Sequence, residues 1–345
     1  MFIIDKYKPL TIDDAFFHKD LLKKLESLSK DESIPHMIFY GPSGSGKQTT
    51  ISLFLEMMYD KDVHKLEDSV YKVIGSGNKT IEVIVKQSNY HIVIEPNNNN
   101  FDKYLVQYII KEYAKRIPLD VFKTKKVFKT VLINNIDNMS YYAQTSLRRT
   151  MEKFSNTCRF IMWCHNLSRV IEPLRSRCMC IRVPAPSYTE LLKRMIYICA
   201  DEGVKPTLKQ YTFILDNANG NIKKALWNIQ LLKSNLNYDN IYINTIKQIA
   251  DLIYGCILNE LFTIRTLIYN IMITNVPSTQ IIKDILIEII KKNIDLTVKY
   301  KIILGCAKFE HNLARGRHDI MHLLAFITLT MKLIKETKLI KELKD

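Results

Sequence analysis

The stretch HMIFYGPSGSGKQTTISLFLEMMY (His36–Tyr59) combines a strand-length apolar run, a glycine-rich turn and a segment with helical spacing. The turn has the form G-x-x-x-x-G-K, and strand, loop and helix in this order indicate a phosphate-binding loop. Glycines let main-chain N–H groups approach phosphate oxygens, and the helix N-terminus favours negative charge. A glycine-rich turn that merely precedes a helix is the alternative. The residues predicted to bind nucleotide here are Gly41, Pro42, Ser43, Gly44, Ser45, Gly46, Lys47, Gln48 and Thr49.

Three positions of the predicted nucleotide site depart from the usual pattern. Gln48 stands where Ser or Thr ordinarily supplies a hydroxyl to Mg²⁺. The best candidate for the second, acidic strand lies in TVLINNIDNMS (Thr130–Ser140), where the apolar strand ends in Asn134 and Asn135 instead of Asp-Glu. An amide is neutral, so it holds Mg²⁺ poorly and cannot act as a base. Unless the acidic strand lies elsewhere, the pocket is predicted to hold nucleotide without hydrolysing it, with Mg²⁺ weakly bound or absent.

Composition and charge narrow the class of protein. The chain has 345 residues, a hydrophobic fraction of 47% and a formal net charge of +15, which fits two or three globular domains. The charge favours a polyanionic partner such as nucleic acid, although a Lys-, Asn- and Ile-rich composition would explain it equally well. The seven cysteines form no C-x-x-C pair, and we find no signal peptide or membrane-spanning run. We therefore expect an intracellular protein with free thiols.

The pattern of apolar residues predicts three domains. Residues 1–186 alternate strands and helices, as in an α/β domain with a parallel sheet covered on both faces. After a break at PAPS (Pro184–Ser187), residues 187–239 predict a small helical lid domain and residues 240–345 an all-α domain. The expected strands are the runs at 36–40, 80–85, 90–95, 129–135 and 158–165, and the expected lid helices are at 188–202, 207–217 and 220–234.

A tripeptide downstream carries a possible catalytic arginine. Ser-Arg-Cys (Ser176–Cys178) closes a short predicted helix, so Arg177 would present a rigid guanidinium at a helix end. Such an arginine finger can reach phosphate oxygens on a neighbouring subunit. On this tripeptide alone, a surface arginine near a turn is the more ordinary interpretation.

Several motifs in order resemble the small subunits of replication factor C, the AAA+ sliding-clamp loader. DKYKPLTIDD (Asp5–Asp14) is similar to the family's N-terminal segment near the adenine, and LRRTMEKF (147–154) and IEPLRSRC (171–178) match family signatures. VPAPS (183–187) and GNIKKALWNIQ (220–230) also match, and residues 309–327 resemble the collar domain. The likeness covers essentially the whole chain. It implies an AAA+ domain, a lid and a collar used for oligomerisation.

One type of subunit is most similar, the hydrolysis-deficient end subunit known as human subunit 3 and budding-yeast subunit 5. That type also lacks the hydroxyl after the loop lysine and the Asp-Glu pair, yet keeps Ser-Arg-Cys. The chain departs further at His165, where the sensor-1 Asn is usual although Asn166 is adjacent, and at Lys223, which replaces the sensor-2 Arg. An isoleucine at position 3 or 4 stands where Trp is common.

The resemblance assigns roles to individual residues. It implies that Tyr7, Pro9 and Lys223 bind nucleotide and that Arg177 is an arginine finger acting in trans. Arg148 and Arg149 lie on a helix that faces DNA or the adjacent subunit in the family, so they are predicted to bind DNA. No residue is assigned to a metal.

The resemblance also implies a function. The chain would be part of a hetero-pentamer that uses ATP to load the sliding clamp onto primer–template DNA, and its own pocket would hold ATP or ADP. The assembly would work in the nucleus, or in the replication compartment of the host cell if the chain is viral. The chief alternative is an active AAA+ DNA-remodelling or branch-migration ATPase, which needs a working acidic strand. A small-molecule P-loop kinase is a third possibility, disfavoured by the helical C-terminal third and Ser-Arg-Cys.

Overall fold

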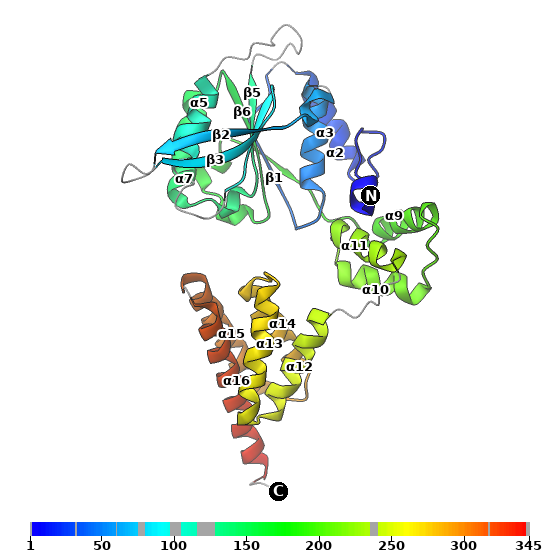
Figure 1. Cartoon of the computed structure of the whole chain (residues 1–345), viewed down its shortest axis with the longest axis vertical. Coiled ribbons are helices and arrows are strands. Elements are labelled where there is room, and N and C mark those ends of the chain that lie inside the picture. The colour runs from blue at the N-terminus through cyan, green and yellow to red at the C-terminus, as the bar shows by residue number, and fades with distance from the viewer. Residues whose placement is uncertain are drawn as a thin grey trace. The chain divides into compact units, whose positions relative to one another are not determined.

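The computed structural model describes residues 2–31, 33–59, 61–74, 80–96, 105–115, 128–234, 241–316 and 318–342. The chain divides into two compact units, residues 1–237 and 238–345 (Figure 1). The first holds a sheet with its helices and the lid helices, and the second is helical. The division of the first unit at residue 186 stays a prediction, and the boundary predicted at residues 239 and 240 lies outside the described residues.

The sheet of the first unit has seven strands in the order β2-β3-β4-β5-β6-β1-β7. Neighbours from β4 to β7 run parallel, whereas β2 pairs with β3 and β3 with β4 in antiparallel fashion. The strands span Met37–Tyr40 (β1), Glu67–Ile74 (β2), Thr80–Gln87 (β3), His91–Ile94 (β4), Lys129–Ile133 (β5), Cys158–Cys164 (β6) and Met179–Arg182 (β7). The predicted α/β fold class is confirmed, with an antiparallel edge added to the parallel sheet.

Alternation along the central strands explains why both faces of this sheet are covered. On β1, Met37 and Phe39 face a cluster with helices α2 and α3, whereas Ile38 between them joins the opposite cluster with α7. Figure 1 shows these helices on the two sides of the sheet. The helices around the sheet are α2 (Lys19–Lys30), α3 (Lys47–Tyr59), α5 (Lys111–Lys115), α7 (Tyr141–Lys153) and α8 (Glu172–Arg175), with short 3₁₀ or π turns η1 (Lys61–His64), η2 (Leu105–Ile110), η3 (Ile136–Asn138) and η4 (Leu167–Arg169).

Two strands, β2 and β7, were not expected from the sequence. Strand β2 reads EDSVYKVI, with charges interrupting its apolar positions, and Val70 is exposed. Strand β7 has four residues, of which only Ile181 is buried. Strand β2 is held by pairing with β3, and β7 by pairing with β1. A local pattern of apolar residues does not reveal such pairing.

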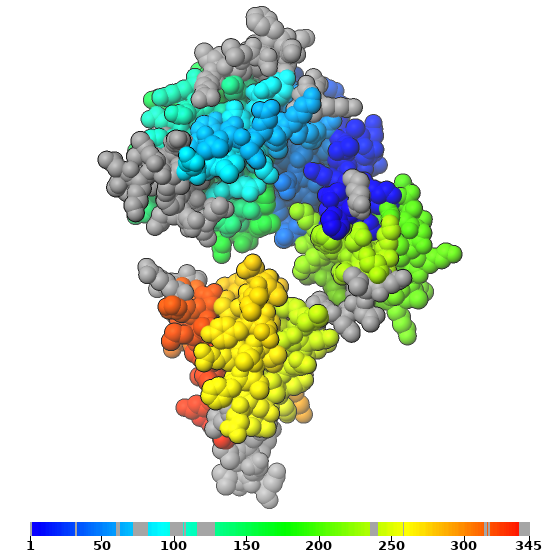
Figure 2. Space-filling model, in the orientation of Figure 1, coloured from blue at the N-terminus to red at the C-terminus, as the bar shows by residue number. Residues whose placement is uncertain are grey.

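The lid consists of α9 (Tyr188–Asp201), α10 (Leu208–Ala218) and α11 (Ile222–Lys233), close to the predicted ranges. Capping boxes start α9 at Ser187 with Glu190 and α10 at Thr207 with Gln210. The short N-terminal helix α1 (Ile3–Lys6) packs against α11, and Figure 2 shows this segment lying on the lid helices. The N-terminus is therefore part of the lid surface in this unit.

The second unit is helical, and most of the buried residues of its core are isoleucines. Its helices are α12 (Ile241–Gly255), α13 (Leu261–Ile273), α14 (Ser278–Ile290), α15 (Leu296–Arg315) and α16 (Asp319–Glu342), with the 3₁₀ turn η5 (Leu258–Glu260). Buried isoleucines from these helices form one continuous core, from Ile246 on α12 to Ile334 on α16. Among the described residues, no helix has the length and apolarity needed to cross a membrane.

Candidate nucleotide site and arginine finger

The phosphate loop follows β1, which lies between β6 and β7 in the sheet. Because these strands are parallel, the loop, the end of β5 and the end of β6 meet at one edge. The loop glycines are required by close packing. A Cβ on Gly41 would lie 2.0 Å from the carbonyl oxygen of Val183, and one on Gly44, whose φ is +73°, would lie 1.9 Å from Oδ1 of Asn221.

The lid contacts this loop directly. Asn221 caps the N-terminus of α11, and the next residue, Ile222, donates its N–H to the carbonyl of Gly44 at 3.0 Å. Lys223 follows within the first turn of α11, and its charge helps to lower the pKa of Lys47. The structure thus brings the predicted sensor-2 lysine close to the phosphate loop.

Lys47 is folded back onto its own loop. It is 4% exposed, and Nζ donates to the carbonyls of Gly41 and Pro42, both at 2.8 Å. Nζ also lies 3.2 Å from Nδ1 of His165, and the ring of Trp163 is 5.4 Å away. Burial lowers the pKa of Lys47 to about 8. The ammonium is thus held by weak neutral acceptors at the place where a phosphate would provide charged ones.

A buried asparagine lies just past the end of β5. Asn134 is 3% exposed, its Nδ2 donates to Oε1 of Glu95 at 2.8 Å, and its Oδ1 accepts from Nε1 of Trp163 at 2.7 Å. Both ends of the amide are therefore occupied. Asn135 adopts a left-handed conformation with φ of +47°, and its Oδ1 is buried without a partner. Across the described residues, no three His, Cys, Asp or Glu side chains gather closely enough to hold a metal.

Asp137, the acid just past β5, has a structural role. It is buried, and its Oδ2 accepts the N–H groups of His165 and Asn166, both at 3.1 Å. These bonds hold the turn after β6 against the turn after β5. His165 is thereby placed beside Lys47, while Asn166 is exposed.

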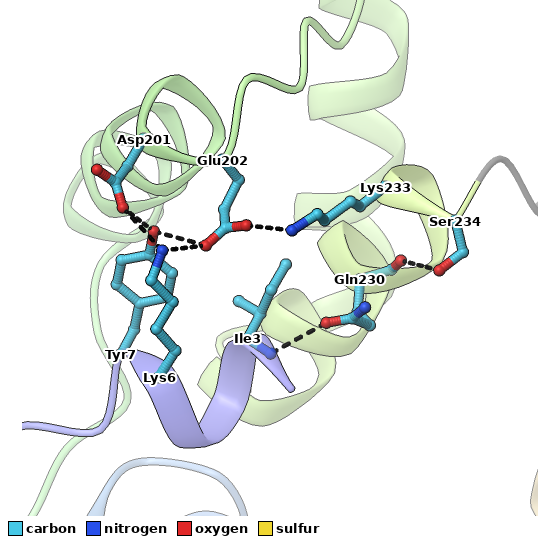
Figure 3. A network of polar contacts seen from close by, with 8 residues as sticks. All are labelled: Ile3, Lys6, Tyr7, Asp201, Glu202, Gln230, Lys233 and Ser234. Atoms are coloured by element: carbon cyan, nitrogen blue, oxygen red, sulfur yellow. Dashed lines mark hydrogen bonds and ion pairs between the residues drawn. The ribbon is translucent and has the colours of Figure 1, made fainter. Parts of the chain in front are cut away.

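The N-terminal segment is tied to the lid by a polar network (Figure 3). The Tyr7 hydroxyl donates to Glu202 at 2.9 Å and also to Asp201, and Lys6 pairs with Glu202 at 2.7 Å. Lys233 pairs with the other oxygen of Glu202, and Figure 3 shows Glu202 between the two lysines. Partial burial and these carboxylates raise the pKa of Tyr7. Tyr7 is therefore held against the lid helices, and Pro9, two residues further on, is partly exposed.

Arg177 lies beyond α8 at the surface, as the sequence predicted. Its Nη1 donates to the carbonyl of Pro173 at 2.8 Å, and its Nε lies 2.8 Å from Oε1 of Glu152 on α7. The same Glu152 oxygen is 4.0 Å from Nε of Arg148. Of the two predicted DNA-binding residues, Arg148 is partly buried and Arg149 is exposed. Sequence reasoning missed the partners Glu152, Glu95 and Trp163, because their contacts join separate elements and no local pattern indicates them.

A phosphate loop beside the central strands of a largely parallel sheet, with a helical lid contacting that loop, defines an AAA+ nucleotide-binding protein. A family model described as the DNA polymerase III delta subunit matches residues 17–187, and one described as the replication factor C subunit 3 C-terminal domain matches residues 242–338.

Relatives match over nearly the whole chain. A replication factor C small subunit of Acanthamoeba polyphaga mimivirus is 41% identical over 96% of this chain and 91% of its own length. Subunit 5 of Oryza sativa is 34% identical over 97% of this chain and 98% of its own. Human subunit 3 is 30% identical over 96% of each chain. The chain belongs to the replication factor C family, as a small subunit of the clamp loader of the type called subunit 3 or 5.

Proposed function

We propose that this chain is the nucleotide-holding end subunit of its clamp loader, with little hydrolysis of its own and with Arg177 acting on the ATP of a neighbouring subunit. The observation that carries the first part is the amide of Asn134, which is hydrogen-bonded at both ends to Glu95 and Trp163. A neutral amide buried in these bonds is a poor ligand for a metal, and it cannot act as a base toward water.

The residues present fit a nucleotide. Close-packed glycines shape the loop, the buried hydroxyl of Ser45 has no hydrogen-bond partner among the described residues, and Lys47 is bound by main-chain carbonyls and by His165. ATP or ADP would satisfy these groups through its phosphates. The donors present do not fit Mg²⁺, since Gln48, Asn134 and Asn135 are amides. We infer that Mg²⁺ is bound weakly or not at all.

Arg177 supports the second part of the proposal. The guanidinium lies at the surface, at the end of a short helix, in a salt bridge that a phosphate could replace. Planar, permanently charged guanidinium groups stabilise the negative charge that spreads over a phosphoryl group in the transition state. The chain thus contributes to ATP hydrolysis without a working hydrolytic site of its own.

Membership in the family supports the remaining partners. We propose that the chain assembles with the other replication factor C subunits into a hetero-pentamer that binds the sliding clamp and primer–template DNA. The net charge of +15 and the arginines of α7 support DNA binding. We place this assembly in the nucleus, or in the replication compartment of a host cell if the chain is viral.

ATP turnover and ADP binding of the purified chain test the proposal, with Lys47→Ala as the control that removes binding. We expect the chain to bind adenine nucleotide and hydrolyse it far below ~1 s⁻¹, the lower end of ordinary enzyme rates. Steady turnover at that rate, abolished by Lys47→Ala, would show an active motor instead. Restoring Gln48→Thr, Asn134→Asp and Asn135→Glu together is expected to recover some activity, and restoring one alone is not.

A further inference from the structure

A nucleotide bound without Mg²⁺ in the predicted pocket needs other positive charge near its phosphates, and side chains can supply it. A nucleotide brings several negative charges, which Mg²⁺ neutralises in most P-loop proteins. Here the metal-binding positions are the amides of Gln48, Asn134 and Asn135. The cations close to the loop include Lys47 itself and Lys223 of the lid. A further cation at the phosphates would substitute for part of the missing metal charge.

His165 is in position to be that cation. Its Nδ1 lies 3.2 Å from the Nζ of Lys47, the atom that binds phosphate in such loops. The main chain of His165 is fixed by the bond from its N–H to Asp137. Its ring packs edge-to-face on Trp163, with centroids 5.3 Å apart and an interplanar angle of 85°. The imidazole is therefore held in place beside the phosphate cradle.

The groups around His165 determine its charge. Burial lowers the pKa of His165, the Lys47 ammonium lowers it further, and Asp137 and the carbonyl of Gly41 oppose them. The ring is thus neutral at pH 7 while Lys47 donates to Nδ1. A phosphate that draws Lys47 away removes this donor and adds negative charge nearby. Both changes favour the protonated ring, which then donates to phosphate oxygen.

We propose that His165 binds the nucleotide phosphates as an imidazolium, so that this site takes up a proton from solvent together with the metal-free nucleotide. The inference rests on the proposed function, because it requires that the pocket binds nucleotide. The preferred ligand is then the free ADP or ATP anion, and binding strengthens as the pH falls.

Calorimetric titration with ADP, in EDTA and at pH 6 and 7, tests this inference. Lys47 is mostly protonated in this range because its pKa is about 8. The ionisation of ADP contributes equally to the pH dependence of wild type and of His165→Asn, so comparing the two cancels it. His311→Asn, at an exposed position of the second unit, serves as the matched control. Two buffers with different ionisation enthalpies report the number of protons taken up.

We expect wild type and His311→Asn to bind more tightly at pH 6 than at pH 7, by a factor that exceeds that of His165→Asn and approaches about tenfold, the limit for one linked proton. Adding Mg²⁺ is expected to leave wild-type binding unchanged or weaker. An equal pH dependence in wild type and His165→Asn, or tighter binding with Mg²⁺, would overturn the inference while leaving nucleotide binding intact.

A second measurement does not depend on a variant. The ring signals of His165 in the labelled wild-type chain, titrated by NMR, are expected to show a higher pKa with ADP than without it. An unchanged pKa in the ADP complex contradicts the inference. Absence of any ADP binding, with or without Mg²⁺, would contradict both the inference and the proposed function.

Discussion

The side chains at the end of β5 and in the loop after α8 differ in burial and in charge. At β5, the positions where a metal ligand and a base are usual hold Asn134 and Asn135, and Asn134 is buried in hydrogen bonds to Glu95 and Trp163. After α8, Arg177 remains charged, exposed and paired with Glu152. The side chain at β5 is thus part of the packing within the chain, whereas Arg177 is at the surface, where its proposed action on another chain requires it.

The largest expected effect is that of Arg177→Ala on the assembled loader. We expect complex assembly to persist and ATP turnover to fall by tenfold or more, because the guanidinium stabilises transition-state charge. Arg177→Lys is expected to restore little, since an ammonium lacks the planar pair of donors. Turnover is measured with clamp and primed DNA present.

The control for this change is Arg182→Ala, which removes an exposed arginine with no assigned role. The unfolding free energy of the isolated Arg177→Ala chain is expected to change by less than about 1 kcal/mol, because an exposed salt bridge contributes little. An assembled Arg177→Ala complex with wild-type turnover would rule out action in trans.

Asn134→Asp tests the other side of the comparison. The change removes the Nδ2 donor and sets a carboxylate against Glu95, where the native side chains lie 2.8 Å apart. We expect a loss of about 1–3 kcal/mol in unfolding free energy at pH 8 and no gain in ATP turnover. Two facing carboxylates raise the pKa of the new acid in the folded state. The loss is therefore present at high pH and shrinks as the pH falls through that raised pKa.

Urea unfolding at pH 8 and pH 5 measures this loss. The double variant Asn134→Asp, Glu95→Gln provides the matched control, because a glutamine amide can donate to the new carboxylate. We expect it to recover most of the stability at pH 8. A stable single variant that hydrolyses ATP would mean that the end of β5 is adapted for catalysis.

Arg149→Ala is expected to weaken DNA binding by the loader more than Arg148→Ala. Arg149 is exposed, whereas Arg148 is partly buried and lies near Glu152. Removing one cation that binds a phosphate reduces the slope of log affinity against log salt by about 0.9 for duplex DNA. Binding measured across a salt series gives the slope for each variant. Equal slopes for both variants and wild type would exclude this helix from the DNA interface.

The smallest expected effect is that of Glu152→Gln. The salt bridge to Arg177 is half-exposed, and Arg177 keeps its bond to the carbonyl of Pro173. We expect stability to change by less than about 0.5 kcal/mol and loader turnover to fall far less than with Arg177→Ala. A loss as large as that of Arg177→Ala would show that Glu152 positions the guanidinium, so the pair of variants separates charge from orientation.

Much of the fold was predictable because its signals are local. Five of the seven strands and all three lid helices have runs of apolar residues with the right period, and the phosphate loop has a defined spacing. Strands β2 and β7 were missed since few of their side chains are buried and pairing with β3 and β1 stabilises them. The roles predicted for Tyr7, Pro9, Lys223 and Arg177 stay predictions.

The sequence alone shows that amides stand at positions 48, 134 and 135, where a metal-binding hydroxyl and an acidic pair are usual. The amide side chain carries no charge whatever the fold, so this conclusion needs no structure. The sequence also shows that the phosphate loop and the arginine after α8 have been kept. Only the tertiary structure shows how the remaining groups are used. Asn134 is satisfied by residues 39 and 29 positions away in the chain, and Lys47 meets His165 across 118 positions. Such contacts arise when parallel strands end at one edge of a sheet, and sheet order is a property of long-range pairing that short-range sequence patterns do not encode.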